Sequence, residues 1–183
     1  MRPTIPALLV LCQAFPGAGV ASDLFGGYSF EHSSSANDDS LSRHGWNASF
    51  AIGVAGPLAL VAEASGHYGT SAGVARGQLT LMGGPRVSFL REGKASPFVH
   101  ALFGLAREKA GVQVLDITIS EDEKRFGMLF GGGLDVRVSA RWAGRLEGDY
   151  ERSSKDGRSR SGVRAGVGAV YRFGRFPKPA PSP

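Results

Sequence analysis

The sequence predicts an all-β protein, a closed eight-stranded antiparallel transmembrane β-barrel with short periplasmic turns and longer outer loops. Two observations carry this prediction. Eight stretches between residues 24 and 173 alternate apolar with polar residues, and the connections between them are alternately short and long. Because successive side chains of a β-strand point to opposite faces, each stretch has one apolar face and one polar face. An even number of such strands, with connections that alternate in length, is typical of a barrel that spans a membrane.

The eight strands are predicted where the alternation is strongest, each ending at a turn signal or a polar loop. They cover residues 24–31, 45–54, 58–67, 78–89, 97–109, 126–138, 142–151 and 163–173. Three connections are short, at residues 55–57, 91–94 and 139–141. The Ala-Gly-Pro sequence of the first is a strong turn signal. Longer polar loops are predicted at residues 32–44, 69–73, 110–124 and 153–161.

Apolar residues occupy alternate positions along each predicted strand. In chain order the apolar faces carry Tyr28 and Phe30; Trp46, Phe50 and Ile52; Leu58 and Leu60; Leu79 and Leu81; Val99, Phe103 and Leu105; Phe126, Phe130 and Val136; Trp142, Leu146 and Tyr150; and Val163, Val167 and Tyr171. Aromatic residues gather near strand ends, as in the aromatic girdles of membrane barrels: Trp46, Phe89, Phe126, Trp142, Tyr150, Tyr171 and Phe173.

The last strand indicates which face points outward. Its apolar row alternates with Arg164, Gly166, Gly168 and Arg172. In a soluble sandwich the arginines would face water, and in a soluble periplasmic calyx resembling the lipocalins the apolar face would point inward. Glycine and arginine suit a crowded polar interior better than a ligand pocket, and glycine within strands marks close backbone approach or curvature. The apolar faces are therefore expected to contact lipid.

The two ends of the chain are predicted to lie outside the barrel domain of residues 23–176. Residues 1–22 read as a cleaved signal peptide, with Arg2 before an apolar centre and Ala21 at a small-residue cleavage site. The single cysteine, Cys12, lies in this segment, so the mature chain is expected to have none. Residues 177–183 form a proline-rich tail that is expected to be disordered. No later window has about 18 consecutive apolar residues, the length that a transmembrane helix needs.

The polar faces of the strands carry a set of charged residues that are expected to meet inside the barrel. This predicted lumen charge network consists of Glu31, Glu63, Arg86, Asp135, Arg137, Arg145, Glu147, Asp149, Glu151, Arg164 and Arg172. An eight-stranded barrel leaves an interior just wide enough for side chains, and buried charges must pair there. The network is expected to be structural and to plug the barrel; the alternative is a small gated pore in which the pairs exchange.

Other polar residues are candidates for ligand binding. Lys155, Arg158 and Arg160 could contact lipopolysaccharide phosphates, and the acidic residues 38–39 or 121–123 could hold divalent cations, although solvated loops are commonly charged. His32, His44 and His67 are placed near the outer rim, where no metal site is predicted. No cofactor is predicted. The net charge of +5 is scattered without an aromatic-basic stripe, so no nucleic acid partner is predicted.

The opening Gly26-Gly27-Tyr28-Ser29-Phe30, the eight-strand layout and the closing segment 169–173 resemble the family of the OmpA transmembrane domain and OmpX, over residues 23–173. The resemblance implies a bacterial outer-membrane protein that the barrel assembly machinery recognises by an aromatic residue near its C-terminus. Phe173 or Phe176 could serve as this residue, although here a proline-rich tail follows it. The resemblance also implies contacts with outer-membrane lipid and lipopolysaccharide, a monomer, and a structural, adhesive or surface-protective role without catalysis.

Two alternatives for the function remain open. The first is a narrow porin-like channel for ions or small solutes. The second is a lipid-modifying barrel enzyme of the kind that places a histidine and a serine on the lipid-facing surface. His32 and Ser34 have the nearest spacing for such a pair, but they lie in a serine-rich segment predicted as loop.

Overall fold

The computed structural model of the chain describes residues 21–35, 40–71, 74–90, 93–114, 117–155 and 158–174. These residues form eight strands: β1 (Ser22–Ser35), β2 (Ser40–Ala55), β3 (Leu58–Ser71), β4 (Val74–Ser88), β5 (Ala95–Val114), β6 (Ile117–Arg137), β7 (Trp142–Lys155) and β8 (Arg158–Phe173). Neighbours in sequence pair antiparallel, and β8 pairs with β1, so the sheet is a closed barrel. The predicted fold class is confirmed.

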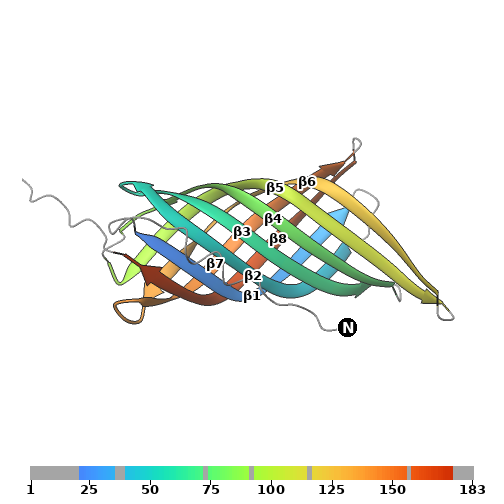
Figure 1. Cartoon of the computed structure of the whole chain (residues 1–183), viewed down its shortest axis with the longest axis horizontal. Helices are drawn as coiled ribbons and strands as arrows, with labels where there is room; N and C mark the ends of the chain where they lie inside the picture. Colours follow the sequence, from blue (N-terminus) through green and yellow to red (C-terminus); the bar gives the residue numbers. More distant parts are fainter. Residues whose placement is uncertain are drawn as a thin grey trace, which may run out of the picture.

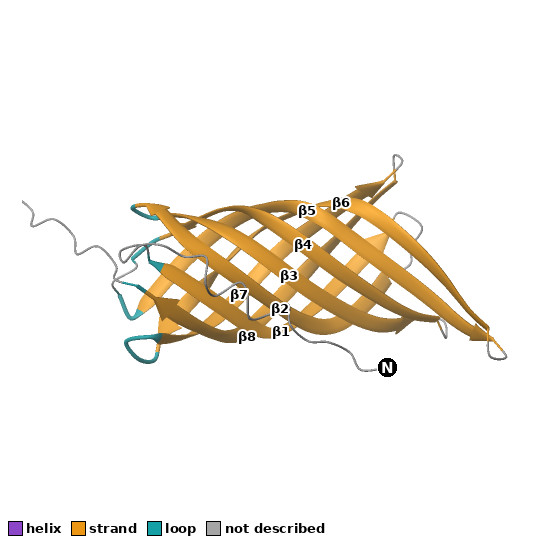
Figure 2. Ribbon diagram, viewed as in Figure 1, coloured by secondary structure: helices purple, strands orange, loops and turns teal. Residues whose placement is uncertain are grey.

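The barrel is a cylinder around which the strands wind obliquely (Figure 1). Three short turns lie at one end, on the left of Figure 2, and join β2 to β3, β4 to β5 and β6 to β7. We call this the turn end and the opposite end the outer end. Within the described ranges, no helix has the length and apolar character needed to cross a membrane. Almost all of the predicted signal peptide and the whole predicted tail lie outside the described residues.

The outer surface of the wall is apolar and its interior is polar, as the alternation predicts. Leu81, Leu105 and Val163 are 66%, 60% and 57% exposed on the outside, whereas Glu63 and Arg164 are 4% and 2% exposed. A water-soluble protein would show the reverse arrangement. Such a surface suits hydrocarbon, in which only helices and closed barrels satisfy every backbone hydrogen bond.

Small residues on the inner face make room for larger ones. A Cβ atom added to Gly133 of β6 would lie 2.7 Å from Cζ of Phe98, and one added to Gly166 of β8 would lie 2.9 Å from Cγ of Glu147. Strand glycines at these two positions therefore permit an aromatic ring and a carboxylate to occupy the interior.

Apolar side chains also fill part of the interior. Leu102 and Leu129 are completely buried in a cluster with four smaller or flexible residues, Ala51, Ala59, Val61 and Met82. A second cluster joins Phe25, Ala143 and Val170 near the turn end. A narrow closed barrel is filled by whichever side chains fit, so some inward positions are apolar.

The strands extend further toward the outer end than the sequence analysis predicts. Residues 110–124, predicted as a loop, continue β5 and β6 as a paired ladder up to Val114↔Ile117, and much of the predicted loop at 32–44 belongs to β1 and β2. Strand pairing requires only backbone hydrogen bonds, so the polar, serine-rich extensions of β1 and β2 carry little alternation that could mark them. In β5 and β6 the alternation does continue through Val112, Val114, Ile117 and Ile119, but these residues were assigned to the loop that contains the acidic run 121–123.

The hairpin of β5 and β6 is the longest part of the wall. These strands have 20 and 21 residues, against 14 to 16 for the others. Their yellow ends reach beyond the rest of the barrel in Figure 1. At about 3.4 Å per residue, the surplus corresponds to about 15–20 Å of strand.

An arginine in the middle of the apolar surface is expected to destabilise the barrel. Leu146 lies on β7 midway between Trp142 and Tyr150 and is 59% exposed. An arginine at the bilayer midplane costs about 2–4 kcal/mol, and one near the membrane surface about 0–1 kcal/mol. Leu146→Arg should lower the free energy of unfolding by about 2–4 kcal/mol in urea titrations in lipid vesicles. Val138→Arg, at the turn end, is the matched control; equal effects of the two substitutions would contradict a lipid-facing position for Leu146.

Candidate functional site: the charged interior

Charged and polar side chains from all eight strands meet inside the barrel in three connected groups. The turn-end group contains Asp23, Arg86, Asp135, Arg145 and Arg172. The central group contains Asn47, Glu63, His100, Glu147, Asp149 and Arg164. The outer group contains Ser29, Glu31, Arg43, His67, Gln78 and Glu151. Almost all of these side chains are buried.

The turn-end group is built around Arg145. Its Nε and Nη2 atoms donate to the two carboxylate oxygens of Asp135 at 2.7 and 3.0 Å, which is the bidentate geometry of a strong charge-assisted pair. The same guanidinium lies 4.9 Å from the ring centroid of Phe25 and 4.5 Å from that of Phe98. Two aromatic faces thus stabilise this cation away from water. Arg86 forms a second bidentate pair with Asp23.

Arg164 is the hub of the central group. From β8 its Nη1 atom donates to Glu63 on β3 at 2.6 Å, and its Nε and Nη2 atoms donate to Asp149 on β7 at 3.0 and 2.8 Å. His100 Nε2 lies 2.8 Å from the other oxygen of Asp149. Asn47 donates a hydrogen bond to Glu147, whose carboxylate lies 3.9 Å from Arg164. One guanidinium therefore links three carboxylates from two sides of the barrel.

The outer group combines one ion pair with several hydrogen bonds. Arg43 Nη2 donates to Glu31 at 2.8 Å, and the second oxygen of Glu31 lies 3.6 Å from His67 Nδ1. The other ring nitrogen of His67 is hydrogen-bonded to Ser29 at 2.7 Å. Gln78 donates to Glu151 at 3.1 Å. These contacts fill the interior beneath the outer end.

The interior leaves little room for solutes. A cavity of about 10 Å³ at the turn end is lined by Asp23, Arg86, Asp135 and Arg172, among others. A second of about 10 Å³ is lined by the outer group. A cavity needs about 10–15 Å³ to hold one water molecule, so each of these two cavities holds about one water molecule. Neither is large enough for a larger solute.

Ten of the eleven residues predicted for the lumen are buried inside the barrel. The eleventh, Arg137, is only half-buried, because it lies at the turn end of β6. The sequence analysis did not assign seven polar members to the network: Asp23, Ser29, Arg43, Asn47, His67, Gln78 and His100. Arg43 was missed because residues 32–44 were predicted as loop. The facing of His100 and Gln78 follows from the alternation with Val99 and Leu79, but neither residue was assigned to the network.

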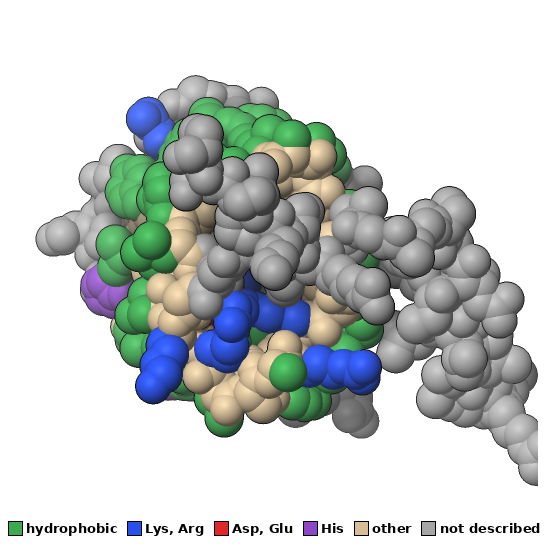
Figure 3. Space-filling model, turned by 90° about the vertical axis from the view of Figure 1, so that its left-hand side faces the viewer, with side chains coloured by type: hydrophobic (Ala, Val, Ile, Leu, Met, Phe, Trp, Pro, Cys, Tyr) green, Lys and Arg blue, Asp and Glu red, His purple; other side chains and the backbone are tan. Residues whose placement is uncertain are grey.

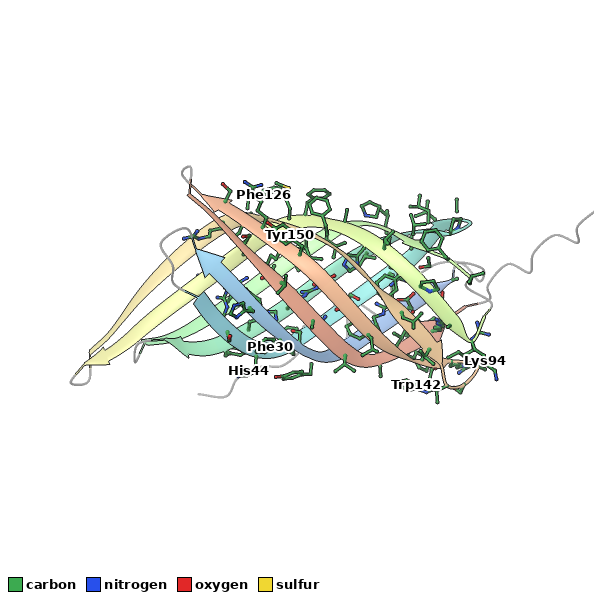
Figure 4. The ribbon with its side chains drawn as sticks, turned by 180° about the vertical axis from the view of Figure 1, so that it is seen from behind. Phe30, His44, Lys94, Phe126, Trp142 and Tyr150 are labelled. Carbon is green, nitrogen blue, oxygen red and sulfur yellow. The ribbon has the colours of Figure 1, made fainter. Side chains whose placement is uncertain are left out.

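The histidines lie on opposite sides of the wall. His67, predicted near the outer rim, is 1% exposed and faces the interior as a member of the outer group. His32 and His44 lie on the outer surface, where His32 Nδ1 is 3.0 Å from Ser42 Oγ and His44 Nδ1 is 3.0 Å from the Tyr28 hydroxyl. Figure 4 shows His44 beside Phe30, whose ring centroid is 5.7 Å away. Among the described residues no three His, Cys, Asp or Glu side chains could together hold a metal ion.

Several predicted ligand-binding side chains lie outside the described residues. These are the side chains of Ser34, Lys155, Arg158, Arg160 and of the acidic residues 38–39 and 121–123. The structure therefore places His32 with Ser42 on the neighbouring strand, and it does not describe the predicted contact with Ser34.

A closed eight-stranded wall with an apolar outside and a side-chain-filled charged interior defines the fold of the outer-membrane β-barrels. Solved structures with this fold include Neisserial surface protein A, with a TM-score of 0.69 and 12% identity over 84% of this chain and 99% of that one. Ail, the attachment invasion locus protein of Yersinia pestis, gives 0.61 and 17% over 85% and 99%. OprG from Pseudomonas aeruginosa gives 0.56 and 10% over 86% and 98%. No protein-family model and no curated sequence matches the chain.

Removal of the central guanidinium is expected to destabilise the barrel strongly. Arg164→Ala leaves Glu63 and Asp149 buried without their cation, and breaking a buried ion pair in this way costs about 3–5 kcal/mol. Arg152→Ala is the matched control, because Arg152 is exposed on the outer face of β7; it should change stability by no more than about 0.5 kcal/mol. Urea unfolding followed by tryptophan fluorescence measures both. A loss at Arg164 no larger than that at Arg152 would contradict a structural role for the central group.

Proposed function

We propose that the protein is an integral protein of the outer membrane of a Gram-negative-type bacterium, with a structural, adhesive or surface-protective role, of which adhesion is favoured. Its barrel serves as a closed anchor, and its contacts with partners are made at the outer end. The observation that carries this proposal is the combination of a filled interior with a β5–β6 hairpin that extends past the rest of the wall.

The filled interior supports an anchor rather than a conduit. Ion pairs of the turn-end and central groups cross the lumen between strands that are not neighbours, for example Arg86 with Asp23 and Arg164 with Glu63. In the outer group the ion pair joins neighbouring strands, and the hydrogen bond from Gln78 on β4 to Glu151 on β7 crosses the lumen. A solute could pass only if several buried pairs separated, and each separated charge would be left without a partner at a cost of several kcal/mol.

The β5–β6 hairpin supports adhesion because one of its edges is open. The ladder between β6 and β7 begins at Phe126↔Ser154, so in the described part of the chain residues 117–124 of β6 pair with β5 alone. An unpaired strand edge presents backbone donors and acceptors to which an extended polypeptide can add as a further strand. Ail, one of the proteins with a similar structure, is an attachment invasion protein by name.

Export and membrane contacts form part of the same proposal. Residues 1–22 would direct secretion, and Lys155, Arg158 and Arg160 at the outer ends of β7 and β8 would contact lipopolysaccharide phosphates. The barrel assembly machinery would insert the chain, which would then act as a monomer.

We propose no catalytic activity. The His32–Ser42 pair lies on the outer face of the wall, but no described hydrogen bond joins a carboxylate to His32, and a serine nucleophile normally requires a base that a third group orients. Mass spectrometry of lipid A from cells with and without the protein tests this proposal. A change in acyl chains that Ser42→Ala abolishes would establish a lipid-modifying enzyme instead.

Shortening of the β5–β6 hairpin is expected to abolish adhesion and leave the barrel intact. Residues 110–121 can be replaced by Asn-Gly, a favoured two-residue hairpin turn, because Lys109 and Asp122 face each other in register. Bacteria that display the full chain should attach to cultured epithelial cells above the level of an empty strain, and the shortened variant should fall to that level. Heat-modifiable migration reports the intact barrel, and Arg152→Ala, which leaves the hairpin unchanged, is the control. Unchanged attachment by the shortened variant would place adhesion elsewhere.

The purified barrel is expected to produce no discrete conductance steps in planar lipid bilayers, because its interior is filled by ion pairs. Heat-modifiable migration of the same preparation shows that the barrel is folded. Reproducible steps from the folded protein would instead establish the narrow porin-like channel.

A further inference from the structure

Basic side chains gather at the turn end of the barrel. Lys94 and Arg141 are exposed there, Arg137 is half-buried, and Arg172 lies at the rim with 9% exposure. Figure 3 shows this end: among the coloured side chains visible on it several are Lys or Arg, and none is Asp or Glu. The nearest described interior acids, Asp23 and Asp135, lie deeper and are paired with Arg86 and Arg145, and Asp135 also accepts a hydrogen bond from Arg172 Nη2 at 3.3 Å.

The four basic residues form an arc along one half of the rim. The backbone N–H of Arg137 donates to the carbonyl oxygen of Lys94 at 2.8 Å, and that of Arg172 donates to the carbonyl oxygen of Arg141 at 2.8 Å. These bonds connect the β4–β5 turn with β6 and the β6–β7 turn with β8. The other half of the rim, from β2 to β4, presents the exposed apolar side chains of Val54, Leu58, Phe89 and Leu90.

Aromatic side chains fix the depth of this arc relative to the lipid. The ring of Tyr171 lies 4.9 Å from that of Trp142 and 4.7 Å from that of Phe173, both in edge-on geometry. Such aromatic clusters mark the membrane–water interface of barrels. Arg141 donates from Nη1 to the Tyr171 hydroxyl at 3.3 Å, so its guanidinium lies at the level of that interface. Figure 4 shows Lys94 and Trp142 at this same end.

We infer that the three outermost members of this arc, Lys94, Arg137 and Arg141, bind the phosphate groups of anionic phospholipids in the leaflet that surrounds the turn end, with the buried Arg172 adding positive charge behind them. Guanidinium groups match phosphate geometry, and a basic side chain near an anionic membrane surface is attracted to it over about one Debye length. The inference rests on the membrane location in the proposed function. Carboxylates of a cell-wall polymer are a weaker match, because Arg141 is held at the aromatic belt rather than away from the membrane.

The two tryptophans of the chain allow each end to be tested separately. Trp142 lies beside Arg141, whereas Trp46 lies toward the outer end of β2, and its partners in register, Tyr28 and Gly66, are uncharged. In the Trp46→Phe variant only Trp142 reports. This variant is refolded into two sets of phosphatidylcholine vesicles. One set contains brominated phosphatidylglycerol and the other contains brominated phosphatidylcholine, and the brominated chains quench a nearby tryptophan.

At low salt, brominated phosphatidylglycerol should quench Trp142 at about a fivefold lower mole fraction than brominated phosphatidylcholine does. A preference of about this size is expected from the attraction of one basic side chain to a charged membrane surface. The preference should weaken at high salt. Lys94→Gln with Arg141→Gln should remove most of it, since both side chains are exposed and the fold does not depend on them. Trp142→Phe, which leaves Trp46 as the reporter, should show no preference.

Equal quenching of Trp142 by the two lipids in a folded, heat-modifiable barrel would overturn the inference. Equal quenching together with salt-sensitive cosedimentation with peptidoglycan sacculi would overturn it in favour of a cell-wall partner. A chain that does not insert into vesicles at all would instead overturn the proposed function, and the inference with it.

Discussion

The need to satisfy every backbone hydrogen bond in hydrocarbon is the constraint on which the structure depends. A strand edge left open to lipid has no water to bond, and each unpaired group costs several kcal/mol. The pairing of β8 with β1 along most of their length, from Ser22↔Phe173 to Ser35↔Arg160, removes that edge. Eight strands close into a cylinder whose interior is only wide enough for side chains. The inward residues must therefore satisfy one another rather than be satisfied by solvent.

The composition of the interior follows from this narrowness. Among the side chains that the structure describes, it contains seven carboxylates and five guanidinium groups, namely Asp23, Glu31, Glu63, Asp135, Glu147, Asp149, Glu151, Arg43, Arg86, Arg145, Arg164 and Arg172. Each guanidinium bonds at least one carboxylate. Hydrogen bonds to Asn47, Gln78, His100 and Ser29 satisfy other polar atoms. Such a network resists rearrangement, because separating one ion pair leaves its charges without partners in a region of low dielectric constant.

A barrel closed in this way has its two ends available for binding, and the ends differ in chemistry. At the outer end, residues 117–124 of the β5–β6 hairpin pair with β5 alone among the residues that the structure describes. At the turn end a basic arc lies beside an aromatic cluster at the membrane interface. The first is suited to an extended polypeptide and the second to phosphate groups. Both rely on the stiff wall between them to hold their backbone in position.

The sequence alone was sufficient for the facing of the strands. Along β8 and β7 the period of two assigned Val167 and Leu146 to lipid and Arg164 and Glu147 to the interior, and these assignments agree with their burial. It failed at the outer ends of the strands, where the extensions around Arg43 and at residues 110–114 and 117–124 were taken for loops. Around Arg43 few apolar residues mark the strand, and only the neighbouring strand reveals it. In the β5–β6 hairpin the alternation continues through Val112, Val114, Ile117 and Ile119, and the sequence analysis overlooked it.

The sequence by itself thus determined how many strands cross the membrane and which side of the wall each residue faces, because the alternation of side chains is a local property of the chain. Only the tertiary structure decided which charges meet. Glu63 and Arg164 are 101 residues apart in the sequence, and they do not belong to the same predicted hairpin. Their contact across the lumen depends on the stagger of the strands in the closed sheet, because the stagger determines which residues of distant strands lie at the same height along the barrel axis. No local pattern encodes that stagger.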